Sequence, residues 1–476
     1  MQRHFISVAA AAATLAFASS PARAVSDAEL ADIRGQLQQV KEQYQSRLDA
    51  LEKRLADAEA RAARAEEKAG RAEATAATAT QAETHARGAA SAFNPEVSLI
   101  LQGTYSNLSQ DPGTYEITGF IPSGGEIGPP PRSFSVGESE LVISASVDPW
   151  FRGQFTAALT PENEVEVEEA FIQTLALGHG FGLKAGRFFS GIGYINEQHP
   201  HSWDFVDAPL AQRAFLGGSN YGDDGVQLKW LAPAPFFLEL GAEAGRGKDF
   251  PGSDRDKNGI NSSAFFVHVG GDAGASHSWR AGLSYLRSTP VDRGYEDLDS
   301  TGVPVANAFS GSSKLLIADL VWKWAPNGDP RDRNFKLQGE YYRRKESGTL
   351  SFDTLDLSGF GSQSGGYDAE QSGWYLQGVY QFMPRWRVGL RYDRLDSGDV
   401  TNDMVLFNTG GLTAADFPGL APHDPDRLTA MLDYSFSEFS RLRLQYARDD
   451  ARLNAGDDQF FVQYIMSLGA HGAHKW

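Results

Sequence analysis

The C-terminal residues of the chain alternate between apolar and mixed positions with a period of two. The apolar set is Phe460, Val462, Tyr464, Met466 and Leu468, and the chain ends on an aromatic residue, Trp476. Successive side chains of a β-strand point to opposite faces, so this alternation predicts a strand with one face in an apolar solvent. The opposite face is expected to be in more polar surroundings.

The same alternation recurs from Phe93 onward in sixteen stretches. Connections of one parity are short, such as Gly178-His179-Gly180 and Met383-Pro384, whereas those of the other parity are mostly long. Short periplasmic turns and long external loops are the pattern of an outer-membrane barrel. We therefore predict an all-β transmembrane barrel of about sixteen antiparallel strands, closed by residues Phe460, Val462, Tyr464, Met466, Leu468 and Trp476 of the last strand.

The predicted strands, the fourth of which has an ambiguous register, are Val97–Leu108, Gly137–Val147, Phe151–Thr160, Val165–Leu177, Phe181–Phe188, Gly225–Leu231, Phe236–Gly245, Ala264–Asp272, Ser278–Arg287, Lys314–Trp324, Asn334–Lys345, Gln371–Phe382, Arg385–Leu395, Arg427–Phe436, Arg441–Arg448 and Gln459 onward.

Polarity sets the orientation of these strands. A lipid-facing Arg or Lys costs about 2–4 kcal/mol at the bilayer midplane, so the charged alternates must face the lumen. The inward set includes Arg385, Arg387, Arg391, Arg441 and Arg443. Sixteen strands enclose a lumen too wide for wall side chains alone to fill, which predicts a water-filled channel unless a loop or plug closes it.

The N-terminal part of the chain has a different composition. Residues 1–24 combine Arg3, an apolar run and an Ala22-Arg23-Ala24 cleavage site, which predicts a secretory signal peptide. Residues 25–92 contain no proline and carry apolar residues at heptad-like spacing, which predicts a periplasmic α-helical coiled coil. A lone helix of this kind is unstable, so we predict self-association through this segment. A solvated helical or disordered spacer is the alternative.

Composition narrows the class of function. The chain has no cysteine, which excludes disulfides and thiol chemistry, and its net charge of -18 argues against nucleic acid as a partner. No G-x-S-x-G or H-E-x-x-H motif is present, so we predict that the chain is not an enzyme.

The long connection from Phe189 to Asp224 resembles, in place and length, the loop that folds inward in trimeric porins. That resemblance implies that Glu197, Asp204 and Asp207 face the arginine-bearing wall across a constriction. Opposed acidic and basic edges would create a transverse field that selects solutes by charge. An external loop with scattered charges is the alternative.

Two kinds of metal site remain open, although the primary prediction is that no cofactor is needed. His199 and His201, near Glu197 and Asp204, suit zinc, as do His471 and His474. The run from Asp254 to Gly259 matches the first half of a calcium loop, but Phe265 stands where its bidentate glutamate is expected. A surface turn is therefore the preferred interpretation of that run.

The order of signal peptide, coiled coil and sixteen strands resembles porins with a periplasmic coiled coil, including phosphate-selective ones. Residues 93–103 and 467–474 resemble uncharacterised proteobacterial barrel proteins labelled zinc-regulated or TonB-dependent receptors. The first resemblance implies a passive channel for small hydrophilic solutes or ions in the outer membrane of a Gram-negative bacterium. Its expected partners are outer-membrane lipid, the barrel-assembly machinery and, because porins are commonly trimers, two further copies of the chain in a homotrimer held by the coiled coil and the barrel. The alternative is a substrate-specific uptake receptor for zinc or a metal chelate.

Overall fold

The computed structural model describes residues 95–123, 127–160, 164–218 and 220–469. The chain divides into two units, Met1–Ala92 and Phe93–Trp476. The predicted signal peptide, the coiled coil, Trp476, His471 and His474 lie outside the described residues. These predictions therefore stay predictions.

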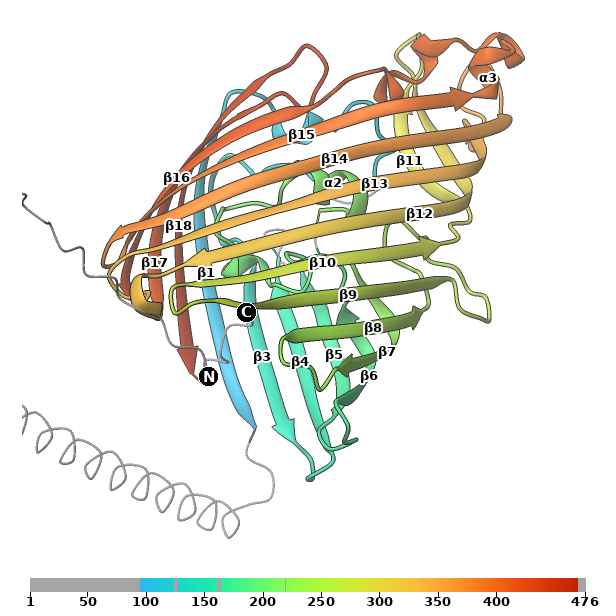
Figure 1. Ribbon diagram of the computed structural model, residues 1–476. Coiled ribbons are helices and arrows are strands. Elements are labelled where there is room, and N and C mark those ends of the chain that lie inside the picture. Colours follow the sequence, from blue (N-terminus) through green and yellow to red (C-terminus); the bar gives the residue numbers. More distant parts are fainter. Residues whose placement is uncertain (1–94, 124–126, 161–163, 219, 470–476) are drawn as a thin grey trace, which may run out of the picture. The chain divides into compact units, whose positions relative to one another are not determined.

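The described residues form one antiparallel sheet of eighteen strands (Figure 1). In chain order these strands are β1 (Glu96–Leu108), β2 (Ser133–Ser135), β3 (Ser139–Ser146), β4 (Phe151–Leu159), β5 (Val165–Thr174), β6 (Phe181–Phe189), β7 (Gly222–Leu231), β8 (Phe237–Gly245), β9 (Ser262–Ala273), β10 (His277–Ser288), β11 (Arg293–Leu298), β12 (Pro304–Trp324), β13 (Asn334–Phe352), β14 (Gln363–Met383), β15 (Trp386–Asn402), β16 (Asp426–Ser437), β17 (Ser440–Asp449) and β18 (Asp457–Gly469).

Pairing of the first and last strands closes the sheet into a barrel. The register between β1 and β18 runs from Ser98 opposite Gly469 to Leu108 opposite Gln459. Two of the eighteen strands are short additions to the barrel wall. β2 pairs with β1 at three positions, and β11 pairs with the first residues of β12, from Pro304 to Phe309. The closed barrel therefore consists of the other sixteen strands. The predicted sixteen-stranded antiparallel barrel is confirmed, and each predicted strand overlaps one of these sixteen. Closure leaves no free edge strand in the ring of sixteen.

Strands β12 to β15 are longer than predicted. β12 begins at Pro304 rather than at Lys314, and β13 continues to Phe352 rather than stopping at Lys345. The additional residues are largely small or polar, so they carry little of the alternation from which strands are predicted. Their backbones nevertheless pair, for example Ala308 with Ser351. Pairing geometry therefore extends these strands beyond the apolar pattern.

The outward face of the barrel is rich in exposed apolar side chains. Leu390 on β15 is 63% exposed, whereas its neighbour Arg391 is 1% exposed as a side chain. The same contrast holds on the other strands, whose exposed apolar residues include Val226, Leu228, Leu240, Leu283, Leu320, Leu376, Leu428, Phe460, Tyr464 and Leu468. An apolar outer face with polar inner alternates is the pattern of a transmembrane barrel. Among the described residues, no helix has the length and apolar character needed to cross a bilayer.

Helices are short and occur in the connections. The α-helices of the described residues are α2 (Leu210–Leu216) and α3 (Asp403–Leu406). Short 3-10 turns are η1 (Pro112–Thr114), η2 (Pro200–Ser202), η3 (Pro326–Gly328), η4 (Thr409–Gly411), η5 (Ala414–Asp416) and η6 (Pro418–Leu420). Figure 1 shows α2 within the ring of strands.

An apolar cluster forms where the connections meet the inner wall. Phe120, Leu210 and Phe215 from connections pack there with inward residues of the wall such as Leu315 and Tyr342. The interior is therefore not lined by wall side chains and water alone. A barrel of sixteen strands is too wide for wall side chains to fill, which leaves room for these connections.

Candidate functional site

The connection between β6 and β7 is anchored to the inner wall through its backbone. The Gly191 amide donates to the Glu243 carboxylate at 2.9 Å, and the Ile195 amide donates to Glu340 at 2.9 Å. Leu210 donates in the same way to Asp393 at 2.9 Å. Buried backbone N–H groups require partners, and the wall carboxylates supply them here. The site is therefore built from this connection and the wall strands that face it.

Helix α2 fixes the centre of the connection. All seven of its residues are buried, and it packs against β13, β14 and β15. The Phe215 ring stacks on Tyr342 with centroids 5.8 Å apart, and Phe120 meets Phe215 edge-on at 5.6 Å. Such aromatic contacts add to the free energy gained by burying apolar area. Packing and amide anchors together hold the connection in one arrangement.

Asp204 lies between two cations of the wall. Its carboxylate is 3.0 Å from Lys336 on β13 and 3.0 Å from Arg387 on β15. Burial opposes ionisation, but the charges of Lys336 and Arg387 together lower the pKa of Asp204 well below its usual value. Asp204 is therefore a carboxylate at neutral pH.

Asp207 makes a second set of ion pairs. Arg391 on β15 approaches one oxygen at 2.8 Å, and Arg427 on β16 approaches the other at 2.5 Å. Burial again opposes ionisation, but Arg427 and Arg391 lower the pKa of Asp207 far below its usual value. Charges this deeply buried are stable only when paired and hydrogen-bonded. The Asp207 carboxylate and the guanidinium groups of Arg391 and Arg427 therefore stabilise one another in their charged forms.

Two further predicted arginines, Arg441 and Arg443, bind backbone rather than carboxylates of the connection. Arg441 donates to the carbonyl oxygens of His201 and Trp203, and Arg443 donates to Trp203 at 2.9 Å. Arg443 also pairs with Asp433 on β16 at 2.8 Å. These carbonyl contacts hold the turn of residues 201–203 against β17.

Two residues predicted for the pore constriction, Arg385 and Glu197, have other positions in the structure. Arg385 is exposed in the tight turn between β14 and β15, with φ of 72°, so its inward assignment was wrong. The turn takes it out of the strand alternation. Glu197 does not face the arginines either, because it pairs with Lys229 on β7 at 2.7 Å. The predicted opposed edges also differ from the structure at Asp204 and Asp207, whose carboxylates touch the wall cations instead of facing them across a gap.

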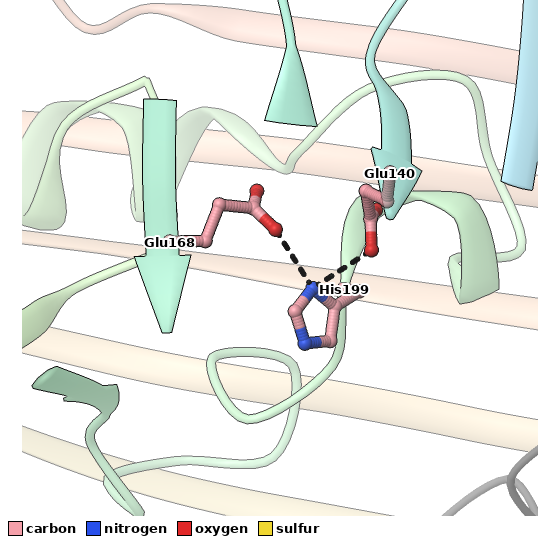
Figure 2. A group of neighbouring side chains, drawn as sticks. All are labelled: Glu140, Glu168 and His199. Atoms are coloured by element: carbon pink, nitrogen blue, oxygen red, sulfur yellow. Dashed lines mark hydrogen bonds and ion pairs between the residues drawn. The ribbon is translucent and has the colours of Figure 1, made fainter. Parts of the chain in front are cut away.

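A second cluster surrounds His199 (Figure 2). Its Nδ1 lies 3.1 Å from Glu168 on β5 and 3.2 Å from Glu140 on β3. Its Nε2 lies 3.1 Å from Glu169, and His201 Nδ1 lies 2.8 Å from Glu140. The histidines are thus near wall glutamates, not near Glu197 and Asp204 as predicted. Burial disfavours the imidazolium, but the nearby carboxylates, Glu140 foremost, raise the pKa of His199 well above its usual value.

A β-bulge explains how two adjacent glutamates reach one histidine. Opposite Thr156 and Ala157 on β4 the register jumps from Glu169 to Val167, which leaves Glu168 as the extra residue. Strict alternation would direct Glu168 and Glu169 to opposite faces, whereas a bulge redirects one of them. Both are in contact with His199 as a result. This irregularity coincides with the strand whose register was ambiguous in the sequence.

Several residues of the site were missed by the sequence analysis. Lys336, Arg427 and Glu140 are inward alternates of predicted strands, so the period-two pattern could have identified them. Glu168 could not be found in this way, because the bulge reverses its expected side. In the run from Asp254 to Gly259, for which the sequence favours a surface turn over a calcium loop, Asp254 pairs with Arg246 at 2.6 Å. The sequence position expected to supply the bidentate glutamate, Phe265, is 55% exposed on the outer face of β9.

Comparison with known proteins gives limited similarity. No family model matches the chain. A protein of Aquifex aeolicus (strain VF5), described only as uncharacterized, is 29% identical over 417 residues, which cover 81% of this chain and 80% of that protein.

Several solved structures are similar at low identity. OmpT, an outer membrane protein of Vibrio cholerae, has a TM-score of 0.48 and 11% identity over 80% of this chain and 98% of its own. The outer membrane channel DcaP of Acinetobacter baumannii has a TM-score of 0.47 and 11% identity over 79% of this chain and 97% of its own. OprB of Pseudomonas putida has a TM-score of 0.46 and 14% identity over 79% of this chain and 94% of its own.

Proposed function

We propose that this chain is a channel in the outer membrane of a Gram-negative bacterium, through which small hydrophilic solutes or ions diffuse. The observation that carries the proposal is the closed barrel whose outer alternates are apolar and whose inner alternates are charged, as at Leu390 and Arg391. Such a surface is stable in lipid, and the inward charges favour a hydrated passage over an apolar one. This role requires no catalytic group, and the absence of enzyme activity stays a prediction.

The connection between β6 and β7 is proposed to narrow that passage. Its ion pairs at Asp204 and Asp207 and the buried helix α2 hold it against β13 to β17. Because it occupies part of the interior, we expect a smaller conductance than that of an unobstructed barrel of sixteen strands. The paired carboxylates also offset the positive charge of the arginine wall.

Planar-bilayer recording of the purified full chain in KCl tests the proposal. The expected result is discrete current steps without any added partner protein. Replacing Asp204 and Asp207 with asparagine is expected to expose the charge of Arg387 and Arg391 and to shift the reversal potential toward anion permeability. A wild-type protein that inserts fully but passes no current would argue against a passive channel.

A metal-uptake receptor is the second candidate, and the His199 cluster is the observation that favours it. A receptor whose passage opens only with a partner protein is expected to pass no current in the same bilayer recording. Zinc or a metal chelate would then be its cargo. The recording therefore separates the two functions.

Self-association through residues 25–92 is also proposed, as a homotrimer. The heptad-like spacing of apolar residues in that segment is the basis for self-association, and the resemblance to trimeric porins is the basis for three copies. Deleting residues 25–92 is expected to lower the oligomer mass measured by light scattering in detergent. An unchanged mass would show that this segment does not hold the oligomer together.

A further inference from the structure

More carboxylate oxygens of β3 and β5 lie near His199 than its two ring nitrogens can satisfy with hydrogen bonds. Glu168 Oε2 and Glu140 Oε2 lie 3.1 and 3.2 Å from the same ring nitrogen, Nδ1. A ring nitrogen carries at most one proton, so it donates fully to one of these two oxygens. Glu140 is completely buried, and its Oε2 accepts no hydrogen bond. This oxygen therefore lies at ion-pair distance from His199 without a hydrogen bond of its own.

We propose that His199 Nδ1, Glu140 Oε2 and Glu168 Oε2 bind a divalent first-row transition-metal cation of the zinc type. These three atoms come from the connection between β6 and β7 and from two wall strands, β3 and β5 (Figure 2). Zinc bonds to histidine nitrogen and carboxylate oxygen are about 2.0–2.2 Å long, which places neighbouring ligand atoms of a tetrahedron roughly 3.3–3.6 Å apart. The separations of 3.1 and 3.2 Å from His199 to the two carboxylates are slightly below that range, and all three ligand atoms lie within 4.8 Å of one another.

The surrounding groups hold these ligands as the outer partners of a metal site do. Glu169 meets the other ring nitrogen of His199 at 3.1 Å, which leaves Nδ1 to the ion. Gln154 donates to Glu169 at 2.9 Å and fixes it in turn. A carboxylate on the far nitrogen of a ligating histidine sets its tautomer and raises its basicity. Glu169 is thus a positioning residue.

His201 plays a similar part for the second ligand. Its Nδ1 lies 2.8 Å from Glu140 Oε1, the oxygen that does not face His199 Nδ1. The two imidazole rings stack with centroids 5.7 Å apart. His201 therefore directs the free oxygen of Glu140 toward the proposed ion.

The charge of the cluster also favours a cation. Glu138 hydrogen-bonds to Glu168, so the group contains Glu138, Glu140, Glu168 and Glu169. A hydrogen bond between two carboxyl groups takes one proton, so Glu138 and Glu168 share a single negative charge. The imidazoles of His199 and His201 contact Glu168, Glu140 and Glu169. A divalent ion supplies positive charge where burial makes excess negative charge costly. The imidazole ligand favours a transition metal over calcium, which prefers oxygen.

This site does not depend on whether the barrel conducts. An ion there would join the connection to β3 and β5, on a part of the wall separate from the arginine contacts of β15 to β17. It involves wall glutamates that the sequence analysis did not associate with the histidines.

Metal titration of the full-length protein in detergent tests the proposal. All proteins carry His471→Ala and His474→Ala, which removes the terminal histidines from competition. We expect one Zn²⁺ per chain by calorimetry, no displacement by an equal concentration of Ca²⁺, and a visible spectrum of four- or five-coordinate Co²⁺. His199→Asn or Glu168→Gln is expected to weaken Zn²⁺ binding at least tenfold, and Glu169→Gln by roughly 10–100-fold.

His268→Asn is the matched control. His268 is a buried histidine that meets a single glutamate, Glu239, at 3.1 Å, and its replacement is expected to leave Zn²⁺ affinity unchanged. Heat-modifiable mobility on gels verifies that each variant is a folded barrel. A folded protein with intact His199 that takes up no stoichiometric Zn²⁺ would overturn the proposal. Folded His199→Asn and Glu168→Gln variants that bind Zn²⁺ as tightly as the parent would overturn it as well.

Discussion

The Asp207 carboxylate lies 2.8 Å from the guanidinium of Arg391, although 184 positions separate the two residues in the chain. Arg391 is 1% exposed and Asp207 is 11% exposed as side chains. The contact joins the connection between β6 and β7 to the inner face of β15. The position of this connection thus depends on a buried ion pair between two residues that are far apart in the sequence.

Asp207→Asn is expected to destabilise the protein by about 3–5 kcal/mol, because it leaves Arg391 and Arg427 buried beside a neutral amide. Denaturant unfolding of the barrel from lipid vesicles measures the free energy of unfolding. Asp254→Asn is the control, since its partner Arg246 is 46% exposed and such surface pairs contribute about 0–1 kcal/mol. Equal losses in the two variants would show that the Asp207 cluster is not buried as described.

Much of the barrel could be predicted from the sequence, because alternation is a local signal. Leu390 and Arg391 differ in polarity at adjacent positions, and that difference assigns each side chain to one face. The turn at Arg385 and the bulge at Glu168 break the alternation locally, which is where the inward assignments fail.

The partners in the candidate site were less accessible to sequence reasoning. Asp204 and Asp207 could be named because they lie in one long connection, but pairing Asp207 with Arg427 requires the fold of the whole barrel. The glutamates near His199 come from strands 31 and 61 positions away from their histidine partners. No local pattern specifies such contacts.

Leu390→Arg is expected to cost about 2–4 kcal/mol of unfolding free energy in lipid vesicles. Leu390 is 63% exposed on the outer face of β15, and a lipid-facing Arg near the bilayer centre carries that penalty. Ser437→Arg, at the exposed C-terminal end of β16, is expected to have little effect in the same assay. A Leu390→Arg variant as stable as the parent would contradict the assignment of this face to lipid.

Asp297 on β11, which is not one of the sixteen barrel strands, is expected to make local stability pH-dependent. Burial raises its pKa to about 6, partly opposed by backbone N–H donors of Leu298 and Gly419. The folded state therefore binds this proton more tightly than the unfolded state, whose Asp pKa is about 3.9. The contribution of this proton to the free energy of unfolding is complete below pH 4 and is lost as pH rises through 6.

Asp297→Asn removes that titration. We expect the variant to gain about 2–3 kcal/mol over the parent at pH 7.5 and nothing at pH 4, because the two pKa values differ by about two units and each unit is worth about 1.36 kcal/mol. Hydrogen exchange of residues 293–309 at the two pH values measures the difference. A gain of equal size at both pH values would exclude the Asp297 proton as its source.

Cysteine modification during single-channel recording tests most directly whether the connection between β6 and β7 borders a conducting lumen. The chain contains no cysteine, so Ser202→Cys in the half-buried turn η2 and Ser437→Cys at the exposed C-terminal end of β16 each present a single thiol. A negatively charged methanethiosulfonate reagent is predicted to label Ser202→Cys and lower its conductance, while labelled Ser437→Cys keeps the wild-type conductance. Ser202→Cys channels that conduct at the wild-type level after complete labelling would contradict the account.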